Sequence, residues 1–437
     1  MKAIIMAGGE GTRLRPVSDG IPKPMVPLLG RPVLEHIINL LRSHGITEIC
    51  LTLKYMPAEI TEYFGDGSAL GIALTYRVES TPLGTAGGIR SCMDFIGNED
   101  FLVISGDAAC DFDLSALIGE HMKKLCAVTM ALHEHPEPLA YGTVLTDAGA
   151  RVLRFIEKPE WPQVITDLVN TGIYVISPQV MSRIPESTPF DFAKELFPRL
   201  MEEGEIIRGV RLDGYWCDIG APAAYHRCVM DALDGKIALV PPLSATQIPT
   251  GVKIIPPVFI GPRVRFGASA FIGPNVSIEG HSFIGSGAKI EHSVLLNTFI
   301  ENGVELTGVT CCPGSVVPRE TRPAAGSVIA RREYSPPSPP LPAPIRTPNP
   351  RTIDSTDCSR SVASPNRAKT MRLLSESFLP LGADFGDGLS IKTKKGTVRI
   401  APAPDRDAII IEARAQSPSL SGDLASEYEN VVRNAAL

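Results

Sequence analysis

The chain has 437 residues, of which 44% are hydrophobic and 21% are charged. These proportions are typical of a globular protein with a sizeable core, and the length allows roughly three domains of about 150 residues each. The net charge of −6 argues against a surface built for DNA or RNA, because such proteins carry a basic field. No apolar run reaches the ~18 residues of a membrane helix, and the nine scattered cysteines form no CxxC pair. We therefore expect a reduced, cytoplasmic protein whose partners are neither nucleic acids nor membranes.

Short apolar runs and helical patterns alternate over residues 1–235. Strands are predicted at residues 2–7, 49–53, 101–105, 127–132 and 172–176, and helices around residues 34–41 and 57–64. Continuous apolar strands separated by helices predict an α/β fold, with a Rossmann-like, mostly parallel sheet covered on both faces. Ligands of such sheets bind at the carboxyl ends of the strands, so the loops after Ala7 and Ser105 are the first candidates for chemistry.

A repeat of six residues covers residues 252–297. Aligned in sixes, this stretch has Val, Ala or Ser at the first position and Ile, Phe or Leu at the third, and glycine fills the fourth position in four of the eight hexads. Such a repeat is typical of a parallel β-helix. We expect a left-handed β-helix over residues 250–330, and a homo-oligomer formed through its faces or edge.

The region after the repeat is rich in proline. Residues 331–366 contain nine of the 39 prolines and predict a linker. Residues 368–437 regain a globular pattern, with strands predicted at 397–400 and 408–412 and a helix at 423–432. About 70 residues is a marginal size for independent folding, so this part is expected to be a small α+β remnant.

A glycine turn directly follows the first strand, in the sequence GGEGTRLRP from Gly8 to Pro16. It is not a P-loop, because no GK[ST] ends it, and it is not a dinucleotide fingerprint, because Leu14 stands where that motif has its third glycine. Glycines let backbone N–H groups approach an anion. Arg13 offers a planar fork for phosphate oxygens, and Lys23 a point charge between two prolines. The alternative is a glycine turn flanked by solvated cations.

Further motifs make the first 235 residues resemble a known family. They are PKPMVP at 22–27, LGTAGG at 83–88, SGD at 105–107, FIEKP at 155–159, NTGIY at 170–174 and WCDIG at 216–220. With GGEGTRLRP, they resemble the signature of sugar-1-phosphate nucleotidyltransferases. The chain is most similar to mannose-1-phosphate guanylyltransferases fused to a β-helix and a phosphomannomutase-like segment. The resemblance implies transfer of a nucleotidyl group from a nucleoside triphosphate to a sugar-1-phosphate, with pyrophosphate released and GDP-mannose as the expected product.

The resemblance also assigns roles to individual residues. It implies that the catalytic residues are Arg13, Lys23, Asp107, Lys158 and Asp218, and that Asp107 and Asp218 bind Mg²⁺. It implies that the substrates contact Gly8, Gly9, Gly11, Thr12, Leu83, Gly84, Thr85, Gly142, Glu157 and Asn170. Taken alone, Asp107 could cap a helix and Asp218 could sit in a turn.

Alternatives to this function stay open. One is the use of glucose-1-phosphate with a uridine, adenosine or thymidine triphosphate, because one base loop does not read out the base. Another is a non-catalytic sensor of nucleotide sugars, which predicts erosion of the charged residues named above. Acyl transfer by the β-helix would need a catalytic histidine, and His281 and His292 occupy positions expected to face solvent. The stretch 401–407 departs from the mutase phosphate loop, so mutase activity is expected to be absent.

Overall fold

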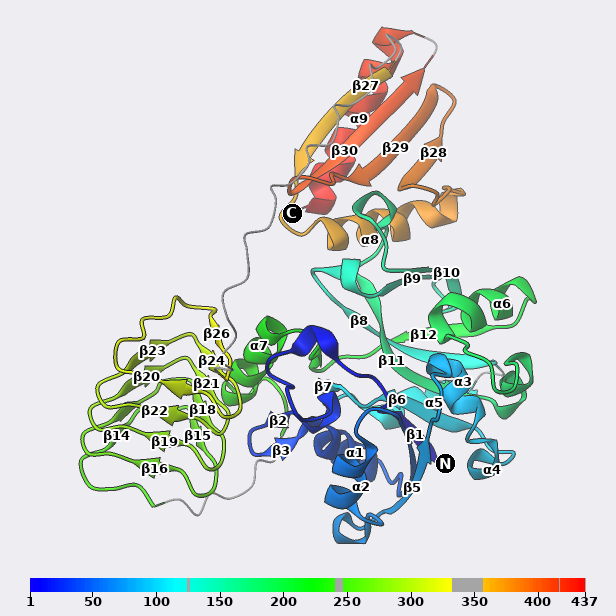
Figure 1. Ribbon diagram of the computed structural model, residues 1–437. Helices are drawn as coiled ribbons and strands as arrows, with labels where there is room; N and C mark the ends of the chain where they lie inside the picture. The colour runs from blue at the N-terminus through cyan, green and yellow to red at the C-terminus, as the bar shows by residue number, and fades with distance from the viewer. Residues whose placement is uncertain (124–125, 240–246, 332–356, 416, 437) are drawn as a thin grey trace, which may run out of the picture. The chain divides into compact units, whose positions relative to one another are not determined.

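The computed structural model describes residues 1–123, 126–239, 247–331, 357–415 and 417–436 (Figure 1). Its contacts divide the chain into two compact units. The first comprises residues 1–116, 184–189 and 213–336, and the second comprises residues 117–183, 190–212 and 337–437. Among the helices described, none combines the length and the apolar content needed to cross a bilayer.

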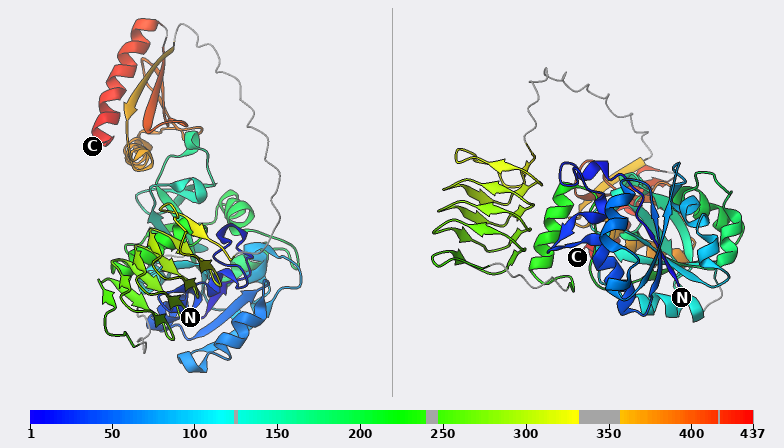
Figure 2. Two further views of the ribbon diagram at one scale, coloured as in Figure 1. Left: turned by 60° about the vertical axis from the view of Figure 1, so that its left-hand side comes forward. Right: turned by 60° about the horizontal axis from the view of Figure 1, so that its bottom comes forward.

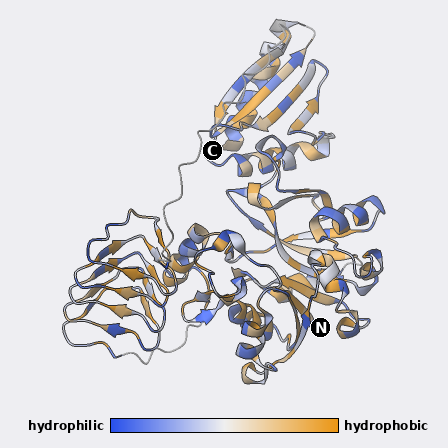
Figure 3. Ribbon diagram, viewed as in Figure 1, coloured by the Kyte–Doolittle hydropathy of each residue, from blue (hydrophilic) through white to orange (hydrophobic). Residues whose placement is uncertain are grey.

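Four parallel strands form the sheet of the first unit, in the order β6-β1-β4-β5. They are β1 (Ala3–Met6), β4 (Glu48–Leu53), β5 (Ala73–Val78) and β6 (Phe101–Ser105). Both neighbours of β1 are parallel to it, and Ile4 and Ile5 are fully buried, as expected for a strand covered on both faces. The hydropathy colouring shows the apolar residues gathered on these central strands (Figure 3).

The first unit contains both helices that the sequence predicts, around residues 34–41 and 57–64, and further helices that no pattern predicted. The helices are α1 (Val33–Ser43), α2 (Pro57–Phe64), α3 (Gly84–Arg90), α4 (Met93–Ile96) and α7 (Pro222–Leu233), while α5 (Leu114–Lys123) runs from the first unit into the second. Helix α1 buries Leu34, Ile37, Ile38 and Leu41, which are the four positions that the 3.6-residue period placed on one face.

Two short antiparallel pairs complete this part of the first unit. Strands β2 (Pro27–Leu28) and β3 (Arg31–Pro32) form a hairpin whose two turn residues, Leu29 and Gly30, both have positive φ, as in a type I′ turn. Strands β7 (Ala108–Cys110) and β13 (Trp216–Asp218) pair with each other, which joins segments that lie far apart in the sequence.

The hexad repeat forms three stacks of parallel strands, as predicted (Figure 2). The stacks are β14 (Lys253–Ile254), β17 (Phe271–Ile272), β20 (Lys289–Glu291) and β23 (Glu305–Thr307); β15 (Val258–Ile260), β18 (Val276–Ile278), β21 (Val294–Leu295), β24 (Thr310–Cys311) and β26 (Val328–Ile329); and β16 (Arg265–Phe266), β19 (Phe283–Ile284), β22 (Phe299–Ile300) and β25 (Val316–Val317).

The registers explain the repeat. Lys253 pairs with Phe271 and Val258 with Val276, so three hexads make one coil of 18 residues. Later coils are shorter, since Phe283 pairs with Phe299, and this matches the weaker repeat there. Aliphatic residues at the inward positions form one core. His281 and His292 are exposed, as expected.

The strands of the second unit that precede residue 213 pair mostly antiparallel, unlike those of the first unit. They are β8 (Val128–Glu134), β9 (Gly142–Thr146), β10 (Val152–Glu157), β11 (Leu168–Ile176) and β12 (Ile207–Arg211), with helix α6 (Phe197–Glu202). Strand β11 is antiparallel to β8 and β9, and β10 is antiparallel to β9. Only the pair of β12 with β8 is parallel among those described here. The parallel character that apolar runs predicted therefore belongs chiefly to the first unit.

The C-terminal part of the second unit is a four-stranded antiparallel sheet with two helices. Its elements are β27 (Asp357–Ala363), α8 (Arg367–Phe378), β28 (Leu389–Lys392), β29 (Gly396–Pro402), β30 (Ala408–Ala415) and α9 (Pro418–Ala436), with the strand order β27-β30-β29-β28. One apolar cluster joins the sheet to both helices. Strand β27 lies inside the stretch 331–366, for which the sequence predicts a linker. The prediction is wrong for this strand, because its residues are mostly polar and show no apolar alternation. Residues 332–356 of that stretch lie outside the described residues.

Candidate active site

A buried lysine lies at the centre of the charged residues of the first unit. Lys23 begins a short 3-10 turn (Lys23–Met25) after Pro22, and its side chain is only 8% exposed. Its Nζ donates hydrogen bonds to Oδ2 of Asp107 at 2.6 Å and to Oδ1 of Asp218 at 3.0 Å. Three of the five predicted catalytic residues therefore meet at one ammonium group.

Each aspartate is positioned by a strand. Asp107 follows the end of β6, where Ser105 Oγ donates to Asp107 Oδ1 at 2.7 Å. Asp218 ends β13 and lies opposite Ala108 of β7, and the Ile219 N–H donates to the Asp107 carbonyl at 3.4 Å. The pairing of β7 with β13 thus brings together two carboxylates from distant parts of the sequence.

The charges of this cluster shift the pKa values of Lys23 and Asp107. Burial lowers the pKa of Lys23, but the attraction of Asp107 and Asp218 outweighs burial and holds the Lys23 pKa above its ordinary value. Burial raises the pKa of Asp107, and the Lys23 ammonium together with the Ser105 hydroxyl outweighs it, so the Asp107 pKa lies below its ordinary value. One ammonium faces two carboxylates, which leaves a net negative charge. Two carboxylate groups that lie this close together are a donor set that suits Mg²⁺, because Mg²⁺ takes few protein ligands.

The predicted glycine turn packs directly on the lysine. Gly11 has φ +65°, and a Cβ at this position would lie 2.7 Å from Cβ of Lys23. Both the backbone conformation and the close approach of Lys23 therefore favour glycine here. Arg13 is exposed. A Cβ built on Gly220 would lie 3.6 Å from Arg13 Nη2 and 2.9 Å from Asp218 Oδ2. The side chains of Arg13 and Asp218 therefore both lie beside Gly220. The remaining turn residues that we predicted as substrate contacts are Gly8, Gly9 and Thr12, of which Gly9 and Thr12 are exposed.

The predicted base loop lies at the start of α3 and is held by a residue that the sequence reasoning missed. The Leu83 N–H donates to Glu79 Oε2 at 3.1 Å, and Gly84, with φ +71°, begins the helix. Burial raises the pKa of Glu79. Thr85, the third predicted contact here, is exposed. No motif marks Glu79, and only its spacing of four residues before Leu83 could have indicated it.

The second unit brings together a separate set of predicted residues. Gly142 pairs with Glu157 across β9 and β10, and a Cβ on Gly142 would lie 2.8 Å from Glu157 Oε2. Burial raises the pKa of Glu157. Asn170, on β11, donates through Nδ2 to the Tyr174 hydroxyl at 2.8 Å. Lys158 is exposed, at φ +47°, directly after β10. These residues lie on, or directly after, three neighbouring strands.

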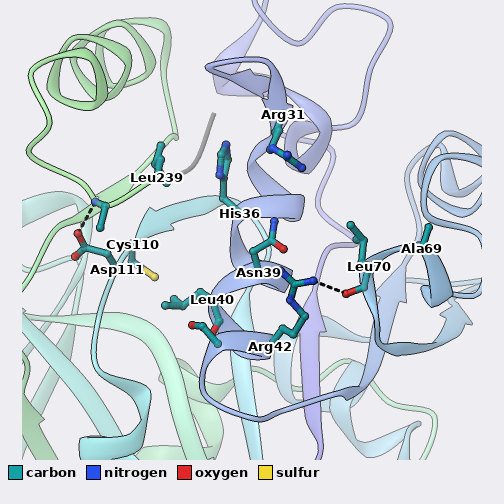
Figure 4. Close-up of a pocket in the computed structure, with 12 residues that line it drawn as sticks. Arg31, His36, Asn39, Leu40, Arg42, Ala69, Leu70, Cys110, Asp111 and Leu239 are labelled. Atoms are coloured by element: carbon teal, nitrogen blue, oxygen red, sulfur yellow. Dashed lines mark hydrogen bonds between the residues drawn. The ribbon is translucent and has the colours of Figure 1, made fainter. Parts of the chain in front are cut away.

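A cavity of about 530 Å³ lies elsewhere in the first unit, beside α1 (Figure 4). It is lined by Arg31, His36, Asn39, Leu40, Arg42, Ser43, Ala69, Leu70, Cys110, Asp111, Ala238 and Leu239. None of the predicted site residues lines it. Asp111 is already bound by the N–H groups of Tyr215 and Ala238, so this cavity does not alter the site described above.

The chain is similar to known proteins of one family. Residues 2–235 match the family model described as Nucleotidyl transferase. The chain is 35% identical over 274 residues to a UTP–glucose-1-phosphate uridylyltransferase of Synechocystis sp., covering 60% of this chain and 69% of the relative. It is 38% identical over 234 residues to a mannose-1-phosphate guanylyltransferase of Mycobacterium tuberculosis, covering 53% and 65%. It is 33% identical over 275 residues to a probable mannose-1-phosphate guanylyltransferase 3 of Oryza sativa subsp. japonica, covering 61% and 73%.

The match over residues 2–235 identifies the chain as a nucleotidyltransferase. The chain belongs to the nucleotidyl transferase family. Its resemblance to the sugar-1-phosphate nucleotidyltransferases is confirmed.

Proposed function

We propose that the chain transfers GMP from GTP to mannose-1-phosphate and releases pyrophosphate. A phosphate oxygen of the sugar-1-phosphate attacks the α-phosphorus of GTP, while the bond from that phosphorus to the oxygen of the pyrophosphate breaks. No covalent intermediate with the protein is needed. Catalysis then depends on holding two anions in line and on neutralising their charge.

The observation that carries the proposal is the placement of Lys23. Its ammonium lies within 3.0 Å of two carboxylates, and the carbon chain of the same residue packs against the glycine turn. Such a buried cation can bind phosphate oxygens as negative charge shifts toward pyrophosphate. Exposed Arg13, which lies near Asp218, is proposed to bind the α- and β-phosphates as negative charge shifts to the leaving pyrophosphate. In the second unit, Lys158 is proposed to bind the sugar phosphate.

Asp107 and Asp218 are the residues that would hold Mg²⁺. A magnesium ion bound there supplies further positive charge for the triphosphate. The carboxylates themselves orient the Lys23 ammonium, and Glu157 and Asn170 are proposed to bind the sugar hydroxyls. The hydrogen bond that Asn170 donates to Tyr174 fixes the amide, with its oxygen accepting from the Gly172 N–H at 3.1 Å.

Pyrophosphate release from purified full-length protein tests the proposal. GTP, UTP, ATP and dTTP are each combined with mannose-1-phosphate and with glucose-1-phosphate. The proposal expects the highest kcat/KM for GTP with mannose-1-phosphate. Turnover of other pairs only would overturn the substrate assignment, and turnover of none would overturn the activity.

A second candidate is transfer of UMP to glucose-1-phosphate. It is favoured by the cyanobacterial relative, whose name states that reaction and whose 35% identity extends over 274 residues. The same substrate matrix separates the two, since each candidate predicts a different preferred pair. The sensor alternative has less support, because Arg13, Lys23, Asp107, Lys158 and Asp218 are all present.

A further inference from the structure

The connection between two predicted sugar-binding segments is unusually buried. Glu157 and Lys158 end β10, Asn170 lies on β11, and residues 159–167 join the strands. Within this connection Val164, Ile165, Thr166 and Asp167 are at most 3% exposed. Connections normally run over the surface, so something must cover this one.

The cover is helix α8 of the C-terminal part, which lies beside the ends of β8 and β9 (Figure 1). Arg372 of α8 donates from Nε to Asp167 Oδ1 at 2.5 Å and from Nη2 to Glu134 Oε1 at 2.7 Å. The Arg372 side chain is 10% exposed and that of Asp167 is 5% exposed. This is a buried, hydrogen-bonded ion pair between segments 205 residues apart in the sequence.

Two further contacts hold the same connection. Ser375, one helical turn after Arg372, donates through Oγ to the Ile165 carbonyl at 2.9 Å. At the other end of the connection, the Arg367 guanidinium lies 3.7 Å from the centroid of the Trp161 ring, which is a cation–π geometry. The connection is thus held at three points by one helix.

Helix α8 is itself fixed to the C-terminal sheet. Met371 and Leu374 lie in the apolar cluster of that sheet, together with Val398 and Ile411. The face of α8 that carries Arg372 and Ser375 is therefore turned toward the connection by the packing of its opposite face.

We propose that the C-terminal part positions the sugar-phosphate-binding segments, and that Arg372 is the positioning residue that acts through Asp167. Asp167 lies immediately before β11, three residues from Asn170, and its carbonyl accepts from the His135 N–H at 2.9 Å. The inference rests on the function proposed above for Glu157, Lys158 and Asn170. It gives the mutase-like remnant a task that needs no mutase chemistry.

Steady-state kinetics of the full chain test the inference. For Arg372→Met we expect KM for mannose-1-phosphate to rise on the order of tenfold, while KM for GTP stays within about twofold. Arg372→Lys, which keeps the charge, should recover part of the loss. The matched control is Arg360→Met, because the Arg360 side chain is 42% exposed and forms its ion pair with Glu429 of the same C-terminal part. Unchanged KM values, or equal changes for both substrates, would overturn the inference.

A second measurement keeps the inference testable apart from activity. Hydrogen exchange of the amides of residues 164–172 should be faster in Arg372→Met than in wild type and in Arg360→Met. If Arg372→Met does not fold, Ser375→Ala removes the bond to Ile165 without leaving a buried charge, and the same exchange is expected. Unchanged exchange in a folded variant contradicts the inference. Absence of turnover in wild type instead contradicts the proposed function.

Discussion

At the scale of single residues, the proposed reaction depends on one buried ammonium balanced by two carboxylates. The Lys23 pKa is held above its ordinary value and the Asp107 pKa below it, so both groups stay charged across the neutral range. Removal of Lys23 leaves two neighbouring carboxylates without their counter-charge, whereas removal of one carboxylate leaves a single ion pair. Conservative substitutions that keep the shape are therefore the useful probes here.

Glu279 of the β-helix is a second residue whose charge matters. It is 7% exposed, accepts from the Gly30 N–H at 3.2 Å, and burial raises its pKa to about 7. The folded protein therefore binds this proton more tightly than the unfolded chain. The free energy of unfolding then falls as the pH rises from about 4.5 to about 7, by about 3 kcal/mol in total.

The prediction is that Glu279→Gln stabilises the protein at pH 8 by up to about 3 kcal/mol, and changes little at pH 4.5. Glutamine keeps an acceptor for Gly30 and carries no charge to desolvate. Urea unfolding at the two pH values measures the difference. The control is Glu305→Gln, at an exposed position of β23. An equal effect of Glu279→Gln at both pH values would contradict the prediction.

At the scale of elements, three contacts hold the hairpin β2–β3, which follows Lys23 in the sequence. The Tyr225 hydroxyl of α7 donates to the Pro27 carbonyl at 2.7 Å, His36 Nε2 of α1 lies 2.8 Å from the Leu28 carbonyl, and Glu279 accepts from Gly30. Burial lowers the His36 pKa, so the ring is neutral at pH 7. Contacts from α1, α7 and the β-helix thus hold the hairpin that follows Lys23.

Tyr225→Phe should therefore destabilise the protein by about 1–3 kcal/mol, because it leaves the Pro27 carbonyl without its donor in a buried place. Tyr225 is fully buried. Tyr76→Phe is the matched control, since its hydroxyl bonds to the Gly65 carbonyl at an exposed site and water can replace it. Thermal unfolding compares the two variants. Equal losses of stability would mean that burial does not determine the cost.

Elements with a regular pattern were predictable, and contacts between them were not. The spacing of Leu34, Ile37 and Leu41 predicted α1, and the hexads predicted the coils, because burial on one face imposes a period on the sequence. Motifs placed Lys23, Asp107 and Asp218 in one site before their distances were known. Glu79, Glu279 and Arg372 were not found, since a single polar residue whose partner lies far along the chain leaves no period.

At the scale of the whole molecule, the chain carries more than the reaction requires. The family match ends at residue 235, and two further modules follow. The β-helix supplies Glu279 to the hairpin after Lys23, and the C-terminal part supplies Arg372 to the connection before β11. Both additions therefore contact segments adjacent to the predicted site residues.

Self-association through the β-helix stays a prediction, and one face of the coil favours it. Phe283, Phe299 and Val316 occupy one outward row on β19, β22 and β25, and Phe299 and Val316 are 45% and 49% exposed. An exposed apolar row is typical of an interface. We expect a homo-oligomer by light scattering, and a lower mass for Phe299→Lys. Glu305→Lys, at the exposed position on another stack, should keep the mass. A monomeric wild type would contradict the prediction.

We propose that Asp107, Asp218 and Lys23 form the catalytic centre of this nucleotidyltransferase. Its most direct test is pyrophosphate release from GTP and mannose-1-phosphate by wild type and by Asp218→Asn, in the presence of Mg²⁺. We expect release that requires both substrates, and a fall in kcat of at least about 10²-fold in the variant. Asparagine keeps the size and a hydrogen-bond acceptor for Lys23, so a folded variant is expected by circular dichroism. Full activity of Asp218→Asn would contradict the account.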